Sequence, residues 1–250
     1  MGKAIALLAL AVILPLTLAA PAVPWRGFTV LTEEFPPYNF TQDGAVRGIS
    51  TDVLVKTLLA AGFPAEAEQF QVLPWARAYN QTLHNPGTLL YSVTRTPERE
   101  ALFKWVGPIA PNRNVLIARK DRKLVLKSLK DAHRLKAGAI RDDAGEQILL
   151  ARGFPAGQID LASDARSNLL KLDSGRIDLF AYPETVFKWV ARQEGRNCDD
   201  YETVFVLHDG YVYFALNKET PGEIVHRLQK ALDGLKESGE VQAVIDRYVN

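Results

Sequence analysis

The sequence predicts an α/β fold made of two halves, each an alternation of strands and helices. Three observations support this prediction. Apolar runs of strand length alternate with segments of helical periodicity from residue 28 onward. The alternation restarts near Asn114, about midway along the chain. The chain also has no internal repeat and no long flexible linker, so tight connections would join two lobes hinged together.

The first half shows a regular order of apolar and polar segments. Proline, asparagine and Asp-Gly signals between 35 and 48 indicate turns, and Gly62 closes the first helical pattern. The expected elements are a strand at 28–31, a helix from 49, a strand and a helix within 67–83, a strand at 87–93 and a helix beginning in 96–106.

The second half repeats this order. We expect a strand at 114–120, a strand, turn and helix within 135–154, a helix, strand and helix within 167–193, and two strands within 201–218. The closing segment has the signature of a helix start, with Thr220 as N-cap and Pro221 at the first position. One apolar stripe follows, formed by Ile224, Leu228, Leu232 and Leu235.

The first 22 residues have the pattern of a secretory signal peptide. Lys3 precedes an apolar run, and a small-x-small site predicts cleavage after Ala22. An uncleaved membrane anchor is the alternative, but Pro15, Pro21 and Pro24 oppose a continuous spanning helix. We therefore expect an exported protein.

Charge and cysteine content exclude several classes of protein. The net charge is only +1, so the basic field that nucleic-acid binding needs is missing. The single cysteine, Cys198, excludes an internal disulfide and a thiolate metal cluster. Signature motifs of phosphate-binding loops, zinc proteases, serine hydrolases and dinucleotide-binding folds are absent, and the four histidines lack ligand spacing. We expect no cofactor, no metal and a periplasmic location.

The stretch "TLLYSVTRTPERE" places anion-binding chemistry at the end of a buried strand. If Thr96 capped the following helix, Arg99 would lie in its first turn, where free N–H groups and the helix dipole favour an anion. Ser92 and Thr94 would add hydroxyl donors to the bidentate guanidinium. The alternative is that Arg95 and Arg99 are surface residues paired with neighbouring glutamates, and the residues alone leave both open.

Other predicted strand ends carry aromatic and charged residues together. Open α/β sheets bind ligands at the carboxyl ends of their strands, and aromatic walls with a few charges are typical of small-molecule pockets. These aromatic residues could equally belong to the core, and an aspartate at a strand-to-helix turn could be an N-cap. The candidates are Glu33, Phe35, Trp75, Arg77, Asp143, Tyr182 and Glu184.

The blocks "EEFPPYNF", "LPWARAY", "SVTRTPERE", "GRIDLFAYPE" and "GEVQAVIDRYV" occur in an order that resembles the family 3 extracellular solute-binding proteins. The resemblance covers nearly all of the chain after the signal. It implies the type II periplasmic-binding-protein fold, whose two lobes are joined by two crossing strands. We expect lobe 1 to comprise 23–114 and 208–250, and lobe 2 to comprise 115–207.

The resemblance also implies roles for individual residues. Arg99 matches the arginine that holds the ligand α-carboxylate, and Thr94 and Ser92 match its hydroxyl partners. Phe35 and Trp75 fall where the family places aromatic rings around the ligand.

The other half of the expected site departs from the family pattern. Asp143 and Ala144 stand where the family usually has hydroxyl-bearing residues. The family acid that binds the ligand ammonium aligns with Pro183, so Tyr182 or Glu184 would have to replace it.

The resemblance therefore implies a monomeric, non-enzymatic receptor for an amino acid or related carboxylate. Its partner would be the inner-membrane permease of an ABC importer. Two alternatives remain. One is a periplasmic dehydratase like cyclohexadienyl dehydratase, with Glu184 as general acid or base. The other is a ligand-sensing module for a membrane receptor.

Overall fold

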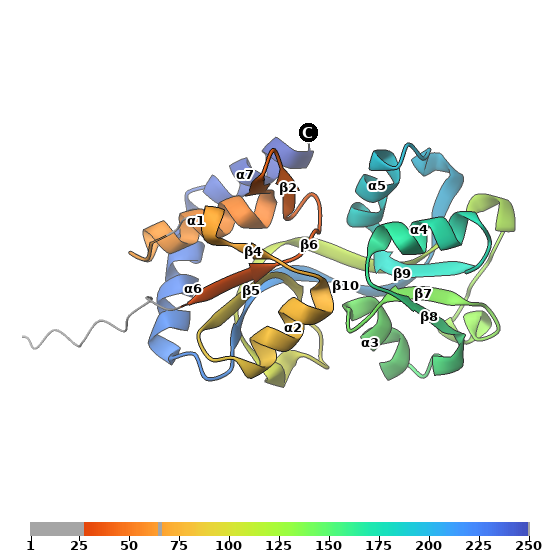
Figure 1. Cartoon of the computed structure of the whole chain (residues 1–250), viewed down its shortest axis with the longest axis horizontal. Helices are drawn as coiled ribbons and strands as arrows, with labels where there is room; N and C mark the ends of the chain where they lie inside the picture. The colour runs from red at the N-terminus through yellow and green to blue at the C-terminus, as the bar shows by residue number, and fades with distance from the viewer. Residues whose placement is uncertain (1–27, 65–66, 250) are drawn as a thin grey trace, which may run out of the picture.

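The computed structural model describes residues 28–64 and 67–249, so the expected signal peptide lies outside the described residues. Two lobes lie side by side, and their strands form one continuous eight-stranded sheet (Figure 1). In spatial order these strands are β4 (Gln71–Val72), β1 (Thr29–Thr32), β5 (Thr88–Thr94), β10 (Tyr201–Asn217), β6 (Phe103–Arg119), β9 (Leu179–Pro183), β7 (Ala137–Ile140) and β8 (Ile159–Ala162).

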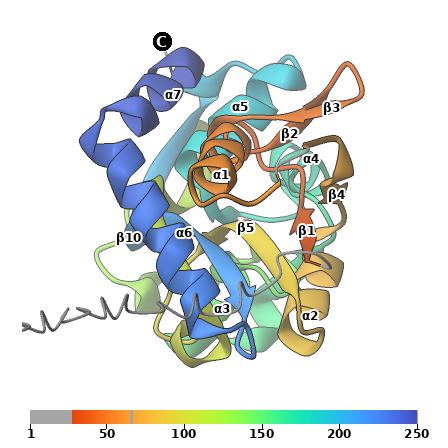
Figure 2. The same ribbon diagram turned by 90° about the vertical axis from the view of Figure 1, so that its left-hand side faces the viewer.

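Helices cover the sheet in both lobes. The first lobe carries α1 (Ile49–Ala60), α2 (Trp75–His84), α6 (Gly222–Glu237) and α7 (Glu240–Val249). The second carries α3 (Ala144–Ala151), α4 (Ala165–Asp173) and α5 (Glu184–Gln193). Figure 2 shows α6 and α7 along one side of the first lobe with α1 next to them, so the C-terminal helices return to the lobe where the described chain begins.

Strands β6 and β10 connect the lobes. They pair antiparallel from Phe103↔Asn217 to Arg119↔Tyr201, with three irregularities in register. In the first lobe β10 also pairs with β5, and in the second β6 also pairs with β9. The two crossing strands are thus confirmed, while the exact lobe boundaries stay a prediction.

Two expectations near these strands are wrong. Residues 96–106 do not open an α-helix: a three-residue 3₁₀ turn, Glu100–Leu102, leads directly into β6. Residues 201–217 form one long strand instead of two. Both differences have one cause, because pairing of β6 with β10 satisfies the backbone groups of both segments across the lobe junction.

The start of α6 is also shifted from the prediction. The helix begins at Gly222 and Pro221 is its N-cap, whereas the Thr220 carbonyl accepts a hydrogen bond from Lys104 Nζ at 2.6 Å. The apolar stripe is confirmed, because Ile224, Leu228, Leu232 and Leu235 are all buried. These residues anchor α6 to the first lobe.

The turn region before α1 contains a hairpin that the sequence analysis did not identify. Strands β2 (Phe40–Gln42) and β3 (Ala45–Arg47) flank Asp43 and Gly44, which both have positive φ. The hairpin extends toward the second lobe, where the ring of Phe40 lies 5.4 Å from that of Trp189 in α5. It forms part of the rim of the space between the lobes.

Gly48, the N-cap of α1, lies so close to the Tyr38 backbone that a larger residue would not fit. Its φ is 122°, and a Cβ there would clash with the Tyr38 carbonyl. We expect Gly48→Ala to lower the free energy of unfolding by about 3 kcal/mol, since strain and overlap add. Urea denaturation would measure the loss. Gly44→Ala is the control, because its φ of 77° costs ~1 kcal/mol but its Cβ meets nothing within 4 Å. Equal losses in the two variants would contradict the clash at Gly48.

Candidate functional site

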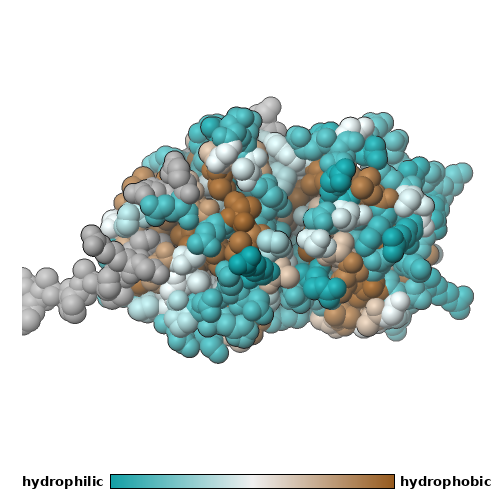
Figure 3. All heavy atoms as spheres, in the orientation of Figure 1, coloured by the Kyte–Doolittle hydropathy of each residue, from teal (hydrophilic) through white to brown (hydrophobic). Residues whose placement is uncertain are grey.

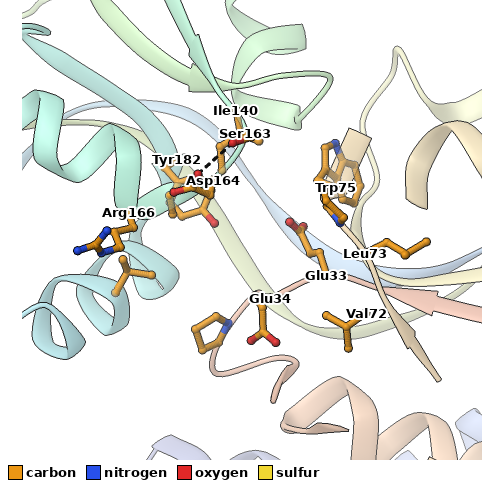
Figure 4. Close-up of a pocket in the computed structure, with 14 residues that line it drawn as sticks. Glu33, Glu34, Val72, Leu73, Trp75, Ile140, Ser163, Asp164, Arg166 and Tyr182 are labelled. Carbon is orange, nitrogen blue, oxygen red and sulfur yellow. Dashed lines mark hydrogen bonds between the residues drawn. The ribbon is translucent and has the colours of Figure 1, made fainter. Parts of the chain in front are cut away.

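A cavity of about 550 Å³ lies between the lobes (Figure 4). The first lobe contributes Glu33 and Glu34, which follow β1, and residues 72–75, which lead from the end of β4 into α2. The second contributes Ile140 at the end of β7 and residues 163–166 after β8, together with Tyr182 of β9. The wall therefore consists largely of residues at the carboxyl ends of parallel strands, as the sequence predicted.

The lining is rich in carboxylates. Glu33, Glu34 and Asp164 line the cavity, whereas among the described residues only Arg166 adds a cationic side chain to the lining. Arg166 is 64% exposed and bonds Glu194 at 2.9 Å. Space-filling Figure 3 shows a mainly hydrophilic face with separate apolar patches on the first and second lobes. The cavity thus combines apolar walls with an excess of negative charge.

Glu33 is the carboxylate that projects into the space between the lobes (Figure 4). Asn39 Nδ2 binds its backbone carbonyl at 2.6 Å, but no described residue donates a hydrogen bond to its side chain. Burial raises its pKa well above the usual value, and the charges of Asp143 and Glu34 add to the effect, while Arg99 opposes it. Glu33 is therefore a carboxylate without a hydrogen-bond donor, facing the cavity.

Asp164 has the opposite environment. It is the N-cap of α4 and accepts hydrogen bonds from the Ser167 backbone N–H at 2.7 Å, from Ser167 Oγ at 2.9 Å and from Ser163 Oγ at 3.0 Å. Partial burial raises its pKa, but these hydrogen bonds outweigh burial and the net shift is downward. Asp164 therefore supplies a stable negative charge on the second lobe.

Arg99 lies behind the cavity wall and is completely buried. Its Nε donates to Gln147 Oε1 at 2.8 Å, Nη1 to the Thr94 carbonyl at 3.3 Å and Nη2 to the Asp142 carbonyl at 3.0 Å. Its guanidinium carbon lies 4.9 Å from the centre of the Trp75 ring. Because Gln147 and Asp142 belong to the second lobe, Arg99 joins the two lobes directly.

Two aromatic residues also cross the lobe junction. Trp75 Nε1 donates to the Asp142 carbonyl at 2.9 Å. Phe35 stacks on Tyr38 and meets the edge of Tyr182 at a centroid distance of 6.2 Å. Both are nearly inaccessible to solvent and serve as core residues of the junction, and Trp75 also lines the cavity.

Asp143 brings a second acid next to Arg99. Its Oδ1 lies 3.9 Å from Arg99 Nη2 and also accepts the Ala144 N–H at 2.6 Å, which confirms the N-cap interpretation. Burial raises its pKa, while Arg99 and the Ala144 hydrogen bond oppose that shift. Burial and the nearby carboxylates of Glu33 and Asp143 also raise the pKa of Tyr182 well above normal.

A family model for bacterial extracellular solute-binding proteins, family 3, matches residues 28–250. The chain belongs to this family. Comparison with curated proteins found no match.

Solved structures with the same two-lobed fold include three informative cases. A histidine kinase sensor domain similar to periplasmic binding proteins has 18% identity and a TM-score of 0.78, with 90% of this chain and 96% of that one covered. An ancestral arginine-binding protein bound to arginine has 19% identity and a TM-score of 0.76, covering 91% and 100%. A Streptococcus pneumoniae ABC uptake transporter substrate-binding protein with bound histidine has 18% identity and a TM-score of 0.74, covering 88% and 92%.

In this family member, Thr94 and Ser92 lie beneath the site. Thr94 Oγ1 accepts a hydrogen bond from Asn112 Nδ2 at 2.8 Å, and its carbonyl supports Arg99. Ser92 has a φ of 64°, and its buried Oγ has no partner among the described residues. Neither residue lines the cavity.

Two other candidate residues, Arg77 and Glu184, lie outside the cavity wall. Arg77 is exposed and is not part of the cavity wall. Glu184 pairs with Lys188 at 2.8 Å and with Arg113 at 3.5 Å, and it lines a different surface hollow near Cys198. The structure therefore gathers Glu33, Trp75 and Tyr182 in the cavity wall, with the remaining candidates behind or outside it.

Sequence reasoning missed the contribution of residues 163–166. The segment "SDARS" carries an N-cap signature, Asp164 followed three residues later by Ser167, at the end of an apolar run. That signal was available, but it predicts a helix start and not a binding role. The described residues also contain no group of three or more side chains suited to holding a metal ion, and no described helix has the length and apolar character to cross a bilayer.

The raised pKa of Glu33 predicts a cost in stability. Between the normal glutamate pKa and that of folded Glu33, the native state binds more protons than the unfolded state, so stability falls as pH rises. We expect Glu33→Gln to raise the melting temperature at pH 7.5 by at least about 2 °C, with a smaller gain at pH 4.5. Differential scanning calorimetry would measure it. Glu34→Gln is the control: Glu34 accepts hydrogen bonds from Thr41, so this variant should gain nothing. A lower melting temperature for Glu33→Gln than for the unaltered protein at pH 7.5 would contradict the raised pKa of Glu33.

Proposed function

We propose that this protein is an exported receptor that captures a small solute bearing an amino group, an amino acid or a related amine, between its two lobes. The observation that carries the proposal is the cavity at the lobe junction, where the Glu33 carboxylate has no hydrogen-bond donor in the described chain. A protonated amino group would give Glu33 the partner that it lacks. The protein would perform no chemistry of its own.

Capture would depend on closure of the lobes. Glu33 and Trp75 belong to the first lobe and Asp164 and Tyr182 to the second, so a ligand that touches all four favours the closed arrangement. The bonds from Trp75 and Arg99 to the Asp142 carbonyl contribute further interactions that exist only when the lobes meet. Bending would be absorbed in β6 and β10, on a microsecond to millisecond timescale.

Delivery to an ABC importer is the role that we propose for the loaded protein. The Streptococcus pneumoniae transporter protein with bound histidine supports this role by its shared fold. The histidine kinase sensor domain supports sensing as a second candidate. Co-purification of the membrane partner separates them: a permease would support transport, and a kinase would support sensing.

A dehydratase role receives less support from the site. Glu184, the expected general acid or base, is held by Lys188 and Arg113 outside the cavity. Absence of prephenate or arogenate turnover in an absorbance assay is therefore the expected result.

A thermal-shift screen of the purified chain against amino acids, primary amines, polyamines and small carboxylates tests capture. A ligand at a hundred times its dissociation constant adds about 2.7 kcal/mol, which is roughly 5–11 °C in melting temperature for a chain of this size. At pH 8 the shift should be lost in Glu33→Gln and kept in Arg77→Gln, because Arg77 lies outside the cavity. A panel without any shift would contradict the proposed function.

A further inference from the structure

The guanidinium of Arg99 already donates its hydrogen bonds to other groups of the protein. Its three hydrogen bonds go to Gln147 and to the carbonyl groups of Thr94 and Asp142. Its guanidinium carbon lies 4.9 Å from the centre of the Trp75 ring and 5.0 Å from that of Tyr79. The side chain has no exposed surface, so a ligand carboxylate reaches it only by displacing these protein groups.

Asp143 provides the negative charge that such a ligand would otherwise bring. Its carboxylate lies 3.9 Å from Arg99 Nη2, and its other partner is the first N–H of α3. A second carboxylate at this place would meet Asp143 and Glu33 together, and like charges in a desolvated site repel. Asp143 thus gives Arg99 the anionic partner that the α-carboxylate of a bound amino acid would otherwise provide.

The cavity itself favours a cation with an apolar body. Glu33, Glu34 and Asp164 line it, while Arg166 is mostly exposed and bonded to Glu194. Val72, Leu73 and Ile140 add apolar residues to the lining (Figure 4). A volume of about 550 Å³ is ample for a six-carbon diamine or an aromatic amine.

We propose that the cavity selects an organic cation without a carboxylate, a primary amine or a guanidine with an aliphatic or aromatic body, over the corresponding amino acid. This inference rests on the proposed function, since it names the class of solute captured at the same site. Glu33 and Asp164 bind the cationic group from opposite lobes, and Asp143 with Arg99 closes the subsite that would accept a carboxylate.

Calorimetric titration of the purified chain with matched pairs tests the inference directly. The pairs are arginine and agmatine, lysine and cadaverine, histidine and histamine, tyrosine and tyramine, and phenylalanine and phenethylamine. In the pair that binds, we expect the amine to bind at least about tenfold more tightly. An amino acid that binds as tightly as its amine, or more tightly, overturns the inference and leaves the proposed function intact. Failure of all ten compounds overturns both.

Asp143→Asn isolates the residue that carries the argument. Asparagine caps helices as well as aspartate does, so α3 keeps its N-cap. Loss of the charge should lower the ratio of amine affinity to amino-acid affinity about tenfold, because the amino acid then binds more tightly. Misfolding would not strengthen the binding of the amino acid. Asp121→Asn removes the same charge from an exposed residue paired with Arg119, and it should leave the ratio unchanged. An unchanged ratio in Asp143→Asn would overturn the role of Asp143.

The pH dependence of amine binding adds an independent readout. Asp143, Glu34 and Tyr182 face Glu33 together with Arg99, and the balance of burial and charge keeps Glu33 protonated beyond the normal range. Amine affinity should therefore rise with pH above the normal glutamate pKa, as Glu33 ionises, with release of a proton on binding. Glu33→Gln should lose this dependence. A flat profile in the unaltered protein would overturn the assignment of Glu33 as the group that binds the cation.

Discussion

The pairing of β6 with β10 is the constraint on which the rest of the structure depends. It runs without a chain break from one lobe to the other and gives each lobe a central strand from the same two segments. The other six strands of the large sheet add to this pair on either side, so the ends of β1, β7 and β9 point at the same junction. The position of the cavity is thus a consequence of this one long pair of strands, which joins its two walls.

The junction concentrates charge that a stable core would avoid. Arg99 and Asp143 are buried close to Glu33, which is partly buried, and one arginine cannot neutralise both acids. Such a cluster costs stability unless a further cation arrives or a proton is held. Hydrogen bonds secure Arg99 and Asp143, whereas Glu33 is left facing the cavity. The negative charge of Glu33 that the protein does not compensate therefore lies at the cavity, where a cationic solute would neutralise it.

The sequence predicted the fold well because its signals are local and repeated. Alternating periodicities, the Asp143 cap and the stripe on α6 all depend on neighbouring residues. The long strands were harder to predict, since nothing within residues 96–106 shows that β10 will satisfy their backbone groups. The site was predicted in part: Glu33, Trp75 and Tyr182 line the cavity, but Arg77 and Glu184 do not. A strand end fixes where a residue lies, and only tertiary contacts decide which way its side chain points.

Arg99 shows most clearly why a pattern of residue types does not settle a ligand. From the sequence, an arginine among hydroxyl groups indicates a grip on a carboxylate. In the folded chain the same arginine is bound by Gln147 and by two backbone carbonyls, and Asp143 stands where the carboxylate was expected. A buried cation is satisfied by whichever acceptors the fold brings closest, and here two of the three, the Gln147 side chain and the Asp142 carbonyl, belong to the opposite lobe. Arg99 thus bonds groups of the second lobe, and under the proposed selection the acids around the cavity, rather than Arg99, would bind the solute.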